Sequence, residues 1–510
     1  MTEKQKSTEA QWFKLRRDLI QPEALQLVPE AMARRYNVIP LEVKGNVLRV
    51  AMANPNDILA IEALETRIRM RIEPQAASPE EVQEAIDYSY QSYEKVKELM
   101  ATISLPDDGE TTIEEITADS VADAPIARAL TVIIDGAIKA RASDIHIQPE
   151  EDNVRVRYRI DGTLHDTLSL PLVTAIPLIS RLKILAKMNI ADRQRPQDGQ
   201  ISVKPKDRPE IDIRVATIPI INGEMAALRL LDKSKAVMTL PQLGFLPESL
   251  AKYEEMLKVP YGMILATGPT GSGKTTTLYA SLNTLDRKGR NIITIEDPVE
   301  YRFKNINQIQ VNPKAGLTFA GGLRSILRLD PNVLLVGEMR DAETAGIAIQ
   351  AALTGHMVLS TIHANDAIGV VARLLDLGIE PFLIASALIG VVAQRMGRRT
   401  CRECAQLVKV SLPEQTAYSK EIGEERSEFL CGSGCKTCAN TGYHGRIGFY
   451  EILRISDQIR TMILKGANAT ELRTQALKEG MIPLIKDGML KVKENITTPA
   501  EVLRNAYSVD

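Results

Sequence analysis

Residues 262–275 read Gly-Met-Ile-Leu-Ala-Thr-Gly-Pro-Thr-Gly-Ser-Gly-Lys-Thr, a short apolar run that leads directly into a glycine-rich loop. A helical pattern follows from Thr276 to Leu285, so strand, loop and helix come in the order that a phosphate-binding P-loop requires. In such a loop the backbone N–H groups close around phosphate oxygens at a helix N-terminus. The motif is matched at all eight positions: Gly268, Pro269, Thr270, Gly271, Ser272, Gly273, Lys274 and Thr275. We therefore expect an α/β domain that binds ATP, with Lys274 on the β and γ phosphates and the Thr275 hydroxyl on Mg²⁺.

Two acidic residues come directly after apolar segments with the character of buried strands. Glu296 follows residues 291–295 and Glu338 follows residues 333–337, while His363 ends a third such segment, residues 357–362. In a parallel α/β sheet these strand ends border the ligand crevice. A carboxylate there can accept a proton from the attacking water or hold the water molecules that surround the metal ion. Either acid taken alone also suits a helix cap or a surface position, but the two together favour hydrolysis, with His363 as a phosphate sensor.

All five cysteines lie between Cys401 and Cys438. Cys401-x-x-Cys404 and Cys435-x-x-Cys438 form two pairs, and each pair supplies two thiolates on a tight knuckle. Together they can surround one Zn²⁺ tetrahedrally, which would make the site structural. The spacing from Cys431 to Cys435 is one residue too long for a repeated pair. The alternative is a set of reduced cysteines without metal.

The composition limits the classes of protein to which the chain can belong. The chain has 510 residues, enough for about three to four domains, with 63 basic and 65 acidic residues. This balance disfavours a nucleic-acid motor. Met1 to Arg17 lacks the apolar stretch of a signal peptide, so we expect a cytoplasmic protein. The longest apolar run, Pro381 to Ala393, is shorter than the roughly 20 residues of a membrane span, and we expect it to form a buried helix.

Upstream of the P-loop the sequence predicts two further domains. Residues 20–95 alternate helical patterns, such as Leu25 to Tyr36, with short strands. Between Lys97 and Arg128 no basic residue occurs and acidic residues crowd together, which is typical of a flexible linker. Residues 154–160 then alternate apolar residues with three arginines, so we expect a strand whose arginines form a solvated face or meet a neighbouring subunit or a phosphate. Asp161-Gly162 predicts a hairpin turn.

With these segments in view, the chain resembles the secretion ATPases that drive type II secretion and type IV pilus assembly. The resemblance covers residues 120–510 strongly and residues 20–100 weakly. It depends on the P-loop, the aspartate box at 295–300, the segment from Leu323 to Asp341 that contains Glu338, and the histidine box at 355–366. The segments 142–147 and 159–162 match as well. Paired cysteines and an extra N-terminal module are features of the assembly motors and not of the retraction motors.

The resemblance implies a multidomain α/β architecture with six parts. These are a small first domain that docks on an inner-membrane platform or its cytoplasmic partner, an acidic linker, a PAS-like second N-terminal domain, a RecA-like motor domain, a four-cysteine zinc module and a C-terminal helical subdomain. We assign them to residues 1–100, 101–123, 124–240, 241–396, 397–446 and 447–510, respectively. Cyclic di-GMP binding is not expected, because the repeated motif of such first domains is missing.

The resemblance also implies roles for single residues. Glu296 would be the general base, Glu338 would organise Mg²⁺, and His363 would sense the γ-phosphate. Arg195 and Arg214 would reach the nucleotide from the second domain, where positive charge stabilises the transferring phosphoryl group. The chain departs from the family pattern at Gln200 and Met225, where basic residues are usual. We therefore expect weaker coupling between domain closure and hydrolysis, unless neighbouring Arg193 or Arg195 substitutes.

The expected function is that of a hexameric ATPase, peripheral to the inner membrane through its partners, that powers assembly of a type IV pilus or a type II secretion pseudopilus. One alternative is a scaffold that binds ATP and hardly hydrolyses it. Another is a nucleic-acid translocase, which the balanced charge and the lack of interleaved aromatic and basic residues disfavour.

Overall fold

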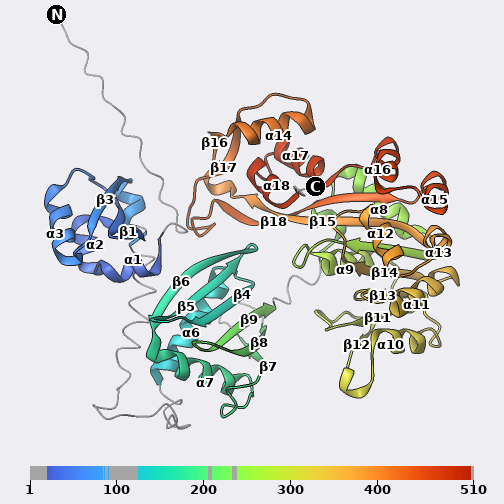
Figure 1. Ribbon diagram of the computed structural model, residues 1–510, viewed down its shortest axis with the longest axis horizontal. Coiled ribbons are helices and arrows are strands. Elements are labelled where there is room, and N and C mark those ends of the chain that lie inside the picture. The colour runs from blue at the N-terminus through green and yellow to red at the C-terminus, as the bar shows by residue number, and fades with distance from the viewer. Residues whose placement is uncertain are drawn as a thin grey trace, which may run out of the picture. The chain divides into compact units, whose positions relative to one another are not determined.

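The computed structural model describes residues 20–83, 85–86, 90, 124–204, 210–231 and 238–506 (Figure 1). The linker expected at 101–123 and the N-terminal segment from Met1 to Arg17 lie outside these residues. The chain divides into two compact units. One comprises the chain up to residue 233 together with 401–405 and 432–444, and the other comprises 234–400, 406–431 and 445–510. The six-part division expected from the sequence stays a prediction.

The second unit is built on a seven-stranded sheet with the order β12-β11-β13-β14-β10-β15-β18. The strand from the P-loop segment, β10, pairs in parallel with β14 on one side and β15 on the other, and β11 pairs in parallel with β12 and β13. All carboxyl ends of these strands therefore meet at one edge. The strands are β10 (Gly262–Thr267), β11 (Ile292–Glu296), β12 (Asn307–Gln310), β13 (Val333–Val336), β14 (Met357–Ile362), β15 (Leu388–Thr400) and β18 (Tyr443–Arg454).

Helices cover both faces of this sheet, so its inner strands β10, β11, β13 and β14 are buried along their whole length. Alternate side chains of β10 enter different cores. Met263 and Leu265 pack with residues of α10 (Phe319–Ile326), α11 (Ala342–Leu353), α12 (Gly369–Asp376) and α13 (Pro381–Ala387). Ile264 and Ala266 pack with residues of α8 (Pro247–Lys258) and α9 (Lys274–Thr284). The P-loop thus follows a strand that is fixed from both sides.

The apolar run from Pro381 to Ala393 is not one buried helix, and that prediction was wrong. Helix α13 ends at Ala387, and the run continues as strand β15, where Val391 and Val392 pair with Leu265 and Ala266 of β10. A strand in the middle of a parallel sheet is buried on both faces, so it shows an unbroken apolar run without alternation. The β-branched valines favour the strand.

The C-terminal part of this unit adds a two-stranded sheet and helices. The strands are β16 (Ala405–Lys409) and β17 (Glu428–Gly432), and the helices are α14 (Leu412–Ile422), α15 (Asp457–Leu464), α16 (Ala469–Lys478), α17 (Leu484–Lys493) and α18 (Pro499–Ala506). A buried ion pair joins α17 to β18: Lys491 Nζ contacts Asp487 and donates to the carbonyl of Gly448 at 2.7 Å. Asp487 in turn accepts from the backbone N–H of Tyr450 at 3.1 Å.

The first unit contains an antiparallel six-stranded sheet with the order β6-β5-β4-β9-β8-β7. Its core is closed by α6 (Ala124–Lys139) and α7 (Ala175–Leu185). The strands are β4 (Asp144–Pro149), β5 (Asn153–Ile160), β6 (Thr163–Pro171), β7 (Gln197–Val203), β8 (Ile211–Ile220) and β9 (Gly223–Leu231). The hairpin expected at Asp161-Gly162 joins β5 to β6, and both turn residues have the positive φ that such a turn needs.

The arginines of β5 find partners within this sheet. Arg155 donates to both carboxylate oxygens of Asp166 at 2.7 Å, and Arg157 donates to Gln148 at 2.9 Å. Burial alternates strictly along the strand, with the arginines on the half-exposed face. These contacts favour the solvated face over a contact with a phosphate.

The small N-terminal module has a three-stranded sheet of β1 (Val38–Lys44), β2 (Val47–Met52) and β3 (Arg71–Ala76), with α3 (Ile58–Ile68). The helical pattern from Leu25 to Tyr36 forms two helices instead of one, α1 (Pro22–Leu27) and α2 (Glu30–Tyr36). Pro29 explains the break, because proline forces the preceding residue out of the helical region, and Val28 is extended at φ −109° and ψ 110°.

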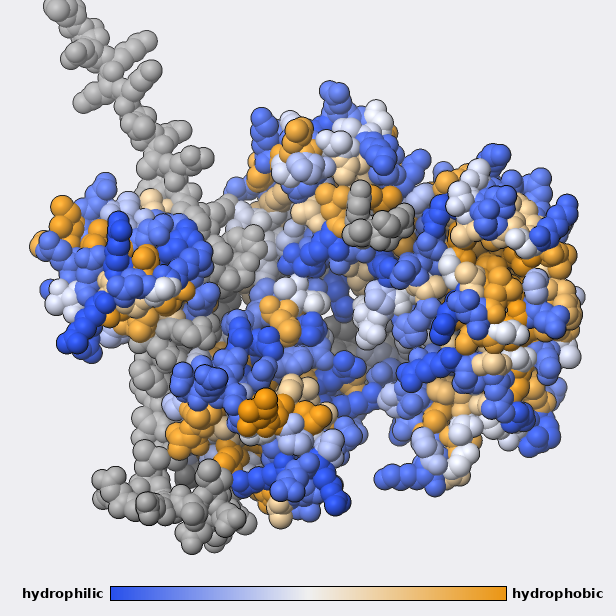
Figure 2. All heavy atoms as spheres, viewed as in Figure 1, coloured by the Kyte–Doolittle hydropathy of each residue, from blue (hydrophilic) through white to orange (hydrophobic). Residues whose placement is uncertain are grey.

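Figure 2 shows hydrophilic residues over much of the visible face, with apolar residues in separate patches. None of the helices in these ranges combines the length and the apolarity needed to cross a bilayer.

Candidate nucleotide and metal sites

The P-loop is shaped by glycines whose positions exclude any larger residue. Gly268 has a φ of 143°, and a Cβ there would lie 2.3 Å from the carbonyl oxygen of Gln394 on β15. Gly273, with a φ of 87°, immediately precedes α9, and a Cβ there would lie 2.8 Å from the Gln394 amide nitrogen. Gln394 is itself buried, and its side-chain oxygen accepts from the Thr277 hydroxyl at 2.8 Å. Strand β15 thus forms the floor of the loop.

Two side chains of the loop are arranged for an anion. Lys274 Nζ donates to the carbonyl oxygens of Gly268 and Pro269 at 2.7 and 3.1 Å, so it folds back over the loop. The buried hydroxyl of Ser272 has no hydrogen-bond partner among the described residues. Burial lowers the pKa of Lys274, Arg395 lowers it further, and Glu338 opposes this shift. A phosphate would give the Ser272 hydroxyl the partner that it lacks among the described residues.

Glu338 and His363 meet at the edge of the sheet next to the P-loop, as expected. His363 Nε2 lies 3.7 Å from one carboxylate oxygen of Glu338, and Arg340 contacts the other at 2.5 Å. The Thr361 hydroxyl donates to the carbonyl oxygen of Gly337 at 2.7 Å, which ties the ends of β13 and β14 together. A role of Glu338 and Thr275 as oxygen ligands of Mg²⁺ stays a prediction.

Glu296 ends β11 and is only 3% exposed. One carboxylate oxygen accepts from the Thr294 hydroxyl at 2.5 Å and from the Gln308 amide at 3.3 Å, and the other accepts from the Tyr279 hydroxyl. The backbone at Gly337 passes close by, since a Cβ there would lie 3.3 Å from Glu296 Cα. The two acidic strand ends are thus neighbours, but their surroundings differ. Glu296 is buried among neutral donors, whereas Glu338 is paired with Arg340.

Sequence reasoning missed three residues of this site. Tyr279 contacts Glu296, Gln394 supports the P-loop, and Arg395 donates to the carbonyl of Asn365, within the histidine box, at 3.0 Å. Burial lowers the pKa of Arg395, and its charge acts on Lys274. Gln394 and Arg395 directly follow the run that we expected to be helical. Reading residues 388–393 as a strand beside β10 would have pointed to both.

Arg195 and Arg214 belong to the first unit and not to the unit of the P-loop. Arg195 lies on an exposed loop before β7, with its side chain 84% exposed and its Nε 4.0 Å from Asp192. Arg214 lies on β8, where its cross-strand neighbours are Gln200 on β7 and Arg229 on β9. Gln200, the departure from the family pattern, is therefore directly beside Arg214. A contact of either arginine with nucleotide stays a prediction.

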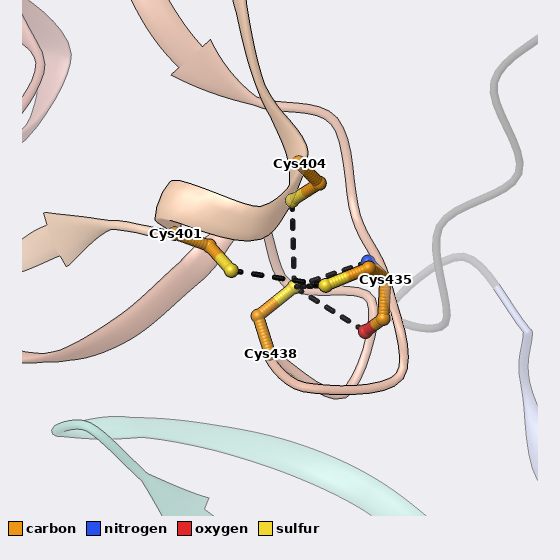
Figure 3. A group of neighbouring side chains, drawn as sticks. All are labelled: Cys401, Cys404, Cys435 and Cys438. Carbon is orange, nitrogen blue, oxygen red and sulfur yellow. Dashed lines mark hydrogen bonds between the residues drawn. The ribbon is translucent and has the colours of Figure 1, made fainter.

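Cys401, Cys404, Cys435 and Cys438 converge as the sequence indicates, and Cys431 is not part of the group (Figure 3). Their sulfur atoms all lie within 4.8 Å of one another, and three of the Sγ···Sγ distances are 3.7, 3.8 and 3.7 Å. A tetrahedral Zn²⁺ with Zn–S bonds of about 2.3 Å requires edges of about 3.8 Å. The backbone N–H groups of Gly434 and Cys435 donate to Cys404 and Cys438 sulfur at 3.2 and 3.1 Å. The four residues therefore fit zinc closely.

The electrostatics of the four thiols also favour a cation. Burial raises the pKa of Cys401 to about 12. Burial acts to raise the pKa of Cys435 as well, but hydrogen bonds from Cys438, Cys401 and neighbouring N–H groups lower it to about 7. Four thiols at this separation, three of them buried, gain from a shared positive ion, which stabilises each of them as a thiolate.

Comparison with known proteins places the chain in a family. The family model described as type II/IV secretion system protein matches residues 119–504, and the MshEN domain matches residues 9–95. The type IV pilus assembly ATPase PilB of Myxococcus xanthus is 41% identical over 495 residues, which cover 95% of this chain and 87% of that protein. Type II secretion system protein E of Dickeya dadantii is 41% identical over 492 residues, 95% and 97% of the two chains.

A solved structure supports the same assignment. The pilus retraction motor PilT with bound ADP aligns with a TM-score of 0.50 at 26% identity, covering 74% of this chain and 96% of that one. The chain therefore belongs to the type II/IV secretion ATPase family, as the sequence motifs predicted.

Proposed function

We propose that this chain hydrolyses ATP to power assembly of a type IV pilus or a type II secretion pseudopilus. The observation that carries the proposal is the convergence of Lys274, Glu296, Glu338 and His363 at one edge of the parallel sheet. A P-loop alone accounts for nucleotide binding. Two carboxylates in different surroundings beside it account for turnover, because one can act on water while the other supports the metal.

In this proposal each residue has a separate task. The P-loop amides, Lys274 and the Ser272 hydroxyl bind the phosphates, and Thr275 and Glu338 hold Mg²⁺, which neutralises charge on the phosphate oxygens. Glu296 accepts the proton of the attacking water. His363, 3.7 Å from Glu338, is placed to respond to the γ-phosphate. The four cysteines hold Zn²⁺ in a structural site.

We further propose that the chain works as a ring of six copies on the cytoplasmic side of the inner membrane, attached through its N-terminal module to a platform protein or its partner. The relatives named as pilus and secretion ATPases support this assignment. We do not propose nucleic acid as a partner, because the numbers of basic and acidic residues in the chain are nearly equal.

Steady-state phosphate release from the purified protein tests the proposal. We expect Mg²⁺-dependent turnover that Lys274→Ala abolishes, because this change removes the charge on the β and γ phosphates. Lys288→Ala, at an exposed lysine of the same unit, is the control and should leave the rate unchanged. ATP binding without turnover would support a scaffold instead, and stimulation by DNA would support a translocase.

A separate prediction concerns Gln200, which lies directly beside Arg214 on the sheet of the first unit. Gln200→Arg should raise the rate of hydrolysis by roughly fivefold, the effect of replacing a neutral hydrogen bond to phosphate by a charged one. Gln200→Met is the control, since it keeps the length of the side chain without adding charge. If the arginine variant shows no gain in rate, position 200 has no part in coupling domain closure to hydrolysis.

A further inference from the structure

We propose that Tyr279 is a positioning residue that orients the Glu296 carboxylate and couples it to the helix of the P-loop. The inference rests on the proposed role of Glu296 as the general base. It adds a residue that none of the sequence motifs had marked as functional. Three independent features of the structure support it: the hydrogen bonds of the hydroxyl, the packing of the ring and the position of Tyr279 on α9.

The Tyr279 hydroxyl bridges the two ends of the aspartate box. It donates to one carboxylate oxygen of Glu296 and accepts from the backbone N–H of Glu300 at 3.4 Å. The Thr294 hydroxyl and the Gln308 amide both donate to the other carboxylate oxygen. Among the described residues, Tyr279 is thus the one donor to the second oxygen. Without the Tyr279 hydroxyl, one carboxylate oxygen of Glu296 would keep its two donors and the other would have none among the described residues.

The ring of Tyr279 is held so that the hydroxyl has little freedom to leave. The side chain is 2% exposed. Phe303 meets it edge to face with ring centroids 4.9 Å apart at 79°, and Tyr301 does so at 6.2 Å and 69°. Burial raises the pKa of Tyr279 above its usual range, and the charge of Glu296 raises it further, so the phenol keeps its proton and remains a donor.

The position of Tyr279 connects this contact to the nucleotide. Helix α9 starts at Lys274, the phosphate-binding lysine, and Tyr279 follows five residues later on the same helix. An α-helix moves as a stiff unit over such a distance. The orientation of Glu296 therefore depends on the position of the P-loop helix, which gives the protein a way to align its base when nucleotide is bound.

The alternative is a purely structural role, in which Tyr279 fills the core and its hydroxyl donates to the nearest acceptor, as buried tyrosines usually do. Tyr253 offers a matched comparison. It is buried in the same core and its hydroxyl shares a hydrogen bond of 2.7 Å with Ser281, also on α9, but it has no contact with an acidic strand end. Tyr253→Phe removes one buried hydrogen bond, whereas Tyr279→Phe removes the bond to Glu296 and the long bond of 3.4 Å from the Glu300 N–H. A purely structural role therefore predicts a loss of stability in both variants and no effect on kcat that is specific to Tyr279→Phe.

The test is ATP hydrolysis by Tyr279→Phe and Tyr253→Phe, each also combined with Glu296→Gln. We expect Tyr279→Phe to lower kcat about tenfold or more, since small misplacements of a catalytic group have effects of this size. The KM for ATP should stay within about twofold of wild type in both variants. In the Glu296→Gln background Tyr279→Phe should cause no further loss, because residues that act as one unit are not additive.

Each outcome separates the two proposals. Equal kcat in the two phenylalanine variants, or a full additional loss on top of Glu296→Gln, would overturn the role of Tyr279. Normal turnover by Glu296→Gln alone would overturn the base and not merely its positioning. If Tyr279→Phe does not fold, 3,5-difluorotyrosine at position 279 keeps the ring and the hydroxyl but makes the phenol more acidic. The more acidic phenol donates a stronger hydrogen bond to the Glu296 carboxylate and weakens it as a base, so kcat should fall below the wild-type value, and an equal kcat would refute the inference.

Discussion

Replacing Glu296 with glutamine is expected to lower kcat for ATP hydrolysis by about 10²–10⁴-fold, the range for loss of a general base. Glutamine has the same shape but cannot accept a proton at neutral pH. ATP binding should persist, because the P-loop, Lys274 and Thr275 are unchanged. The measurement is single-turnover phosphate release together with equilibrium binding of a fluorescent ATP analogue. The outcome of interest is a loss of kcat without a loss of affinity.

The fold should tolerate this change. The glutamine oxygen can accept from the Thr294 hydroxyl and the Gln308 amide, as the Glu296 carboxylate does now, and the new amide can donate to the Tyr279 hydroxyl, which also acts as an acceptor. The expected cost in the free energy of unfolding is about 1–2 kcal/mol, the difference between charged and neutral hydrogen bonds. Glu248→Gln, at an exposed position early in α8, is the control. Unchanged turnover in Glu296→Gln would move the base to another residue.

The second large effect concerns zinc. Purified protein without a tag should contain one Zn²⁺ per chain, and Cys404→Ser should lose it. Structural zinc sites contribute about 10–16 kcal/mol of binding free energy, and in small modules this energy is folding energy. Removal of the metal by chelation or by Cys404→Ser should therefore lower the melting temperature and open residues 401–404 and 433–440 to proteolysis. Elemental analysis and limited proteolysis measure the two effects.

Cys431 provides the matched control for the zinc experiment. It is a partly buried cysteine outside the group of four, so Cys431→Ser removes one thiol and none of the ligands. The variant should keep full metal content and the wild-type melting temperature. Metal-free wild-type protein, or equal loss of zinc in both serine variants, would refute the four-cysteine site.

Much of the motor could be predicted from the sequence, because its signals are local. The strand before the P-loop, the helix after it and the apolar strands before Glu296, Glu338 and His363 each occupy a continuous stretch. The spacing of the paired cysteines likewise identifies the four residues of the predicted metal site. In each of these cases the residues that matter lie within a few positions of the pattern that identifies them.

What the sequence did not reveal depends on contacts between distant segments. The run that begins at Pro381 gives no alternation to separate a buried strand from a buried helix, and its partner β10 is more than 100 residues away. Tyr279 looks like one more apolar residue of an amphipathic helix, and only the fold brings its hydroxyl to Glu296. The positions of Arg195 and Arg214 relative to the nucleotide depend on how the first unit is placed, and local sequence patterns do not give that placement.

The floor of the P-loop also has a consequence for how the protein is made. Gln394, which accepts from Thr277, is 117 residues further along the chain. A ribosome that adds about 5–20 residues per second needs on the order of 6–23 seconds to reach it after the loop has been synthesised. During that interval the nascent motor has its phosphate loop but not the strand that supports it. The contact between Thr277 and Gln394 can therefore form only after β15 has been synthesised and has left the exit tunnel.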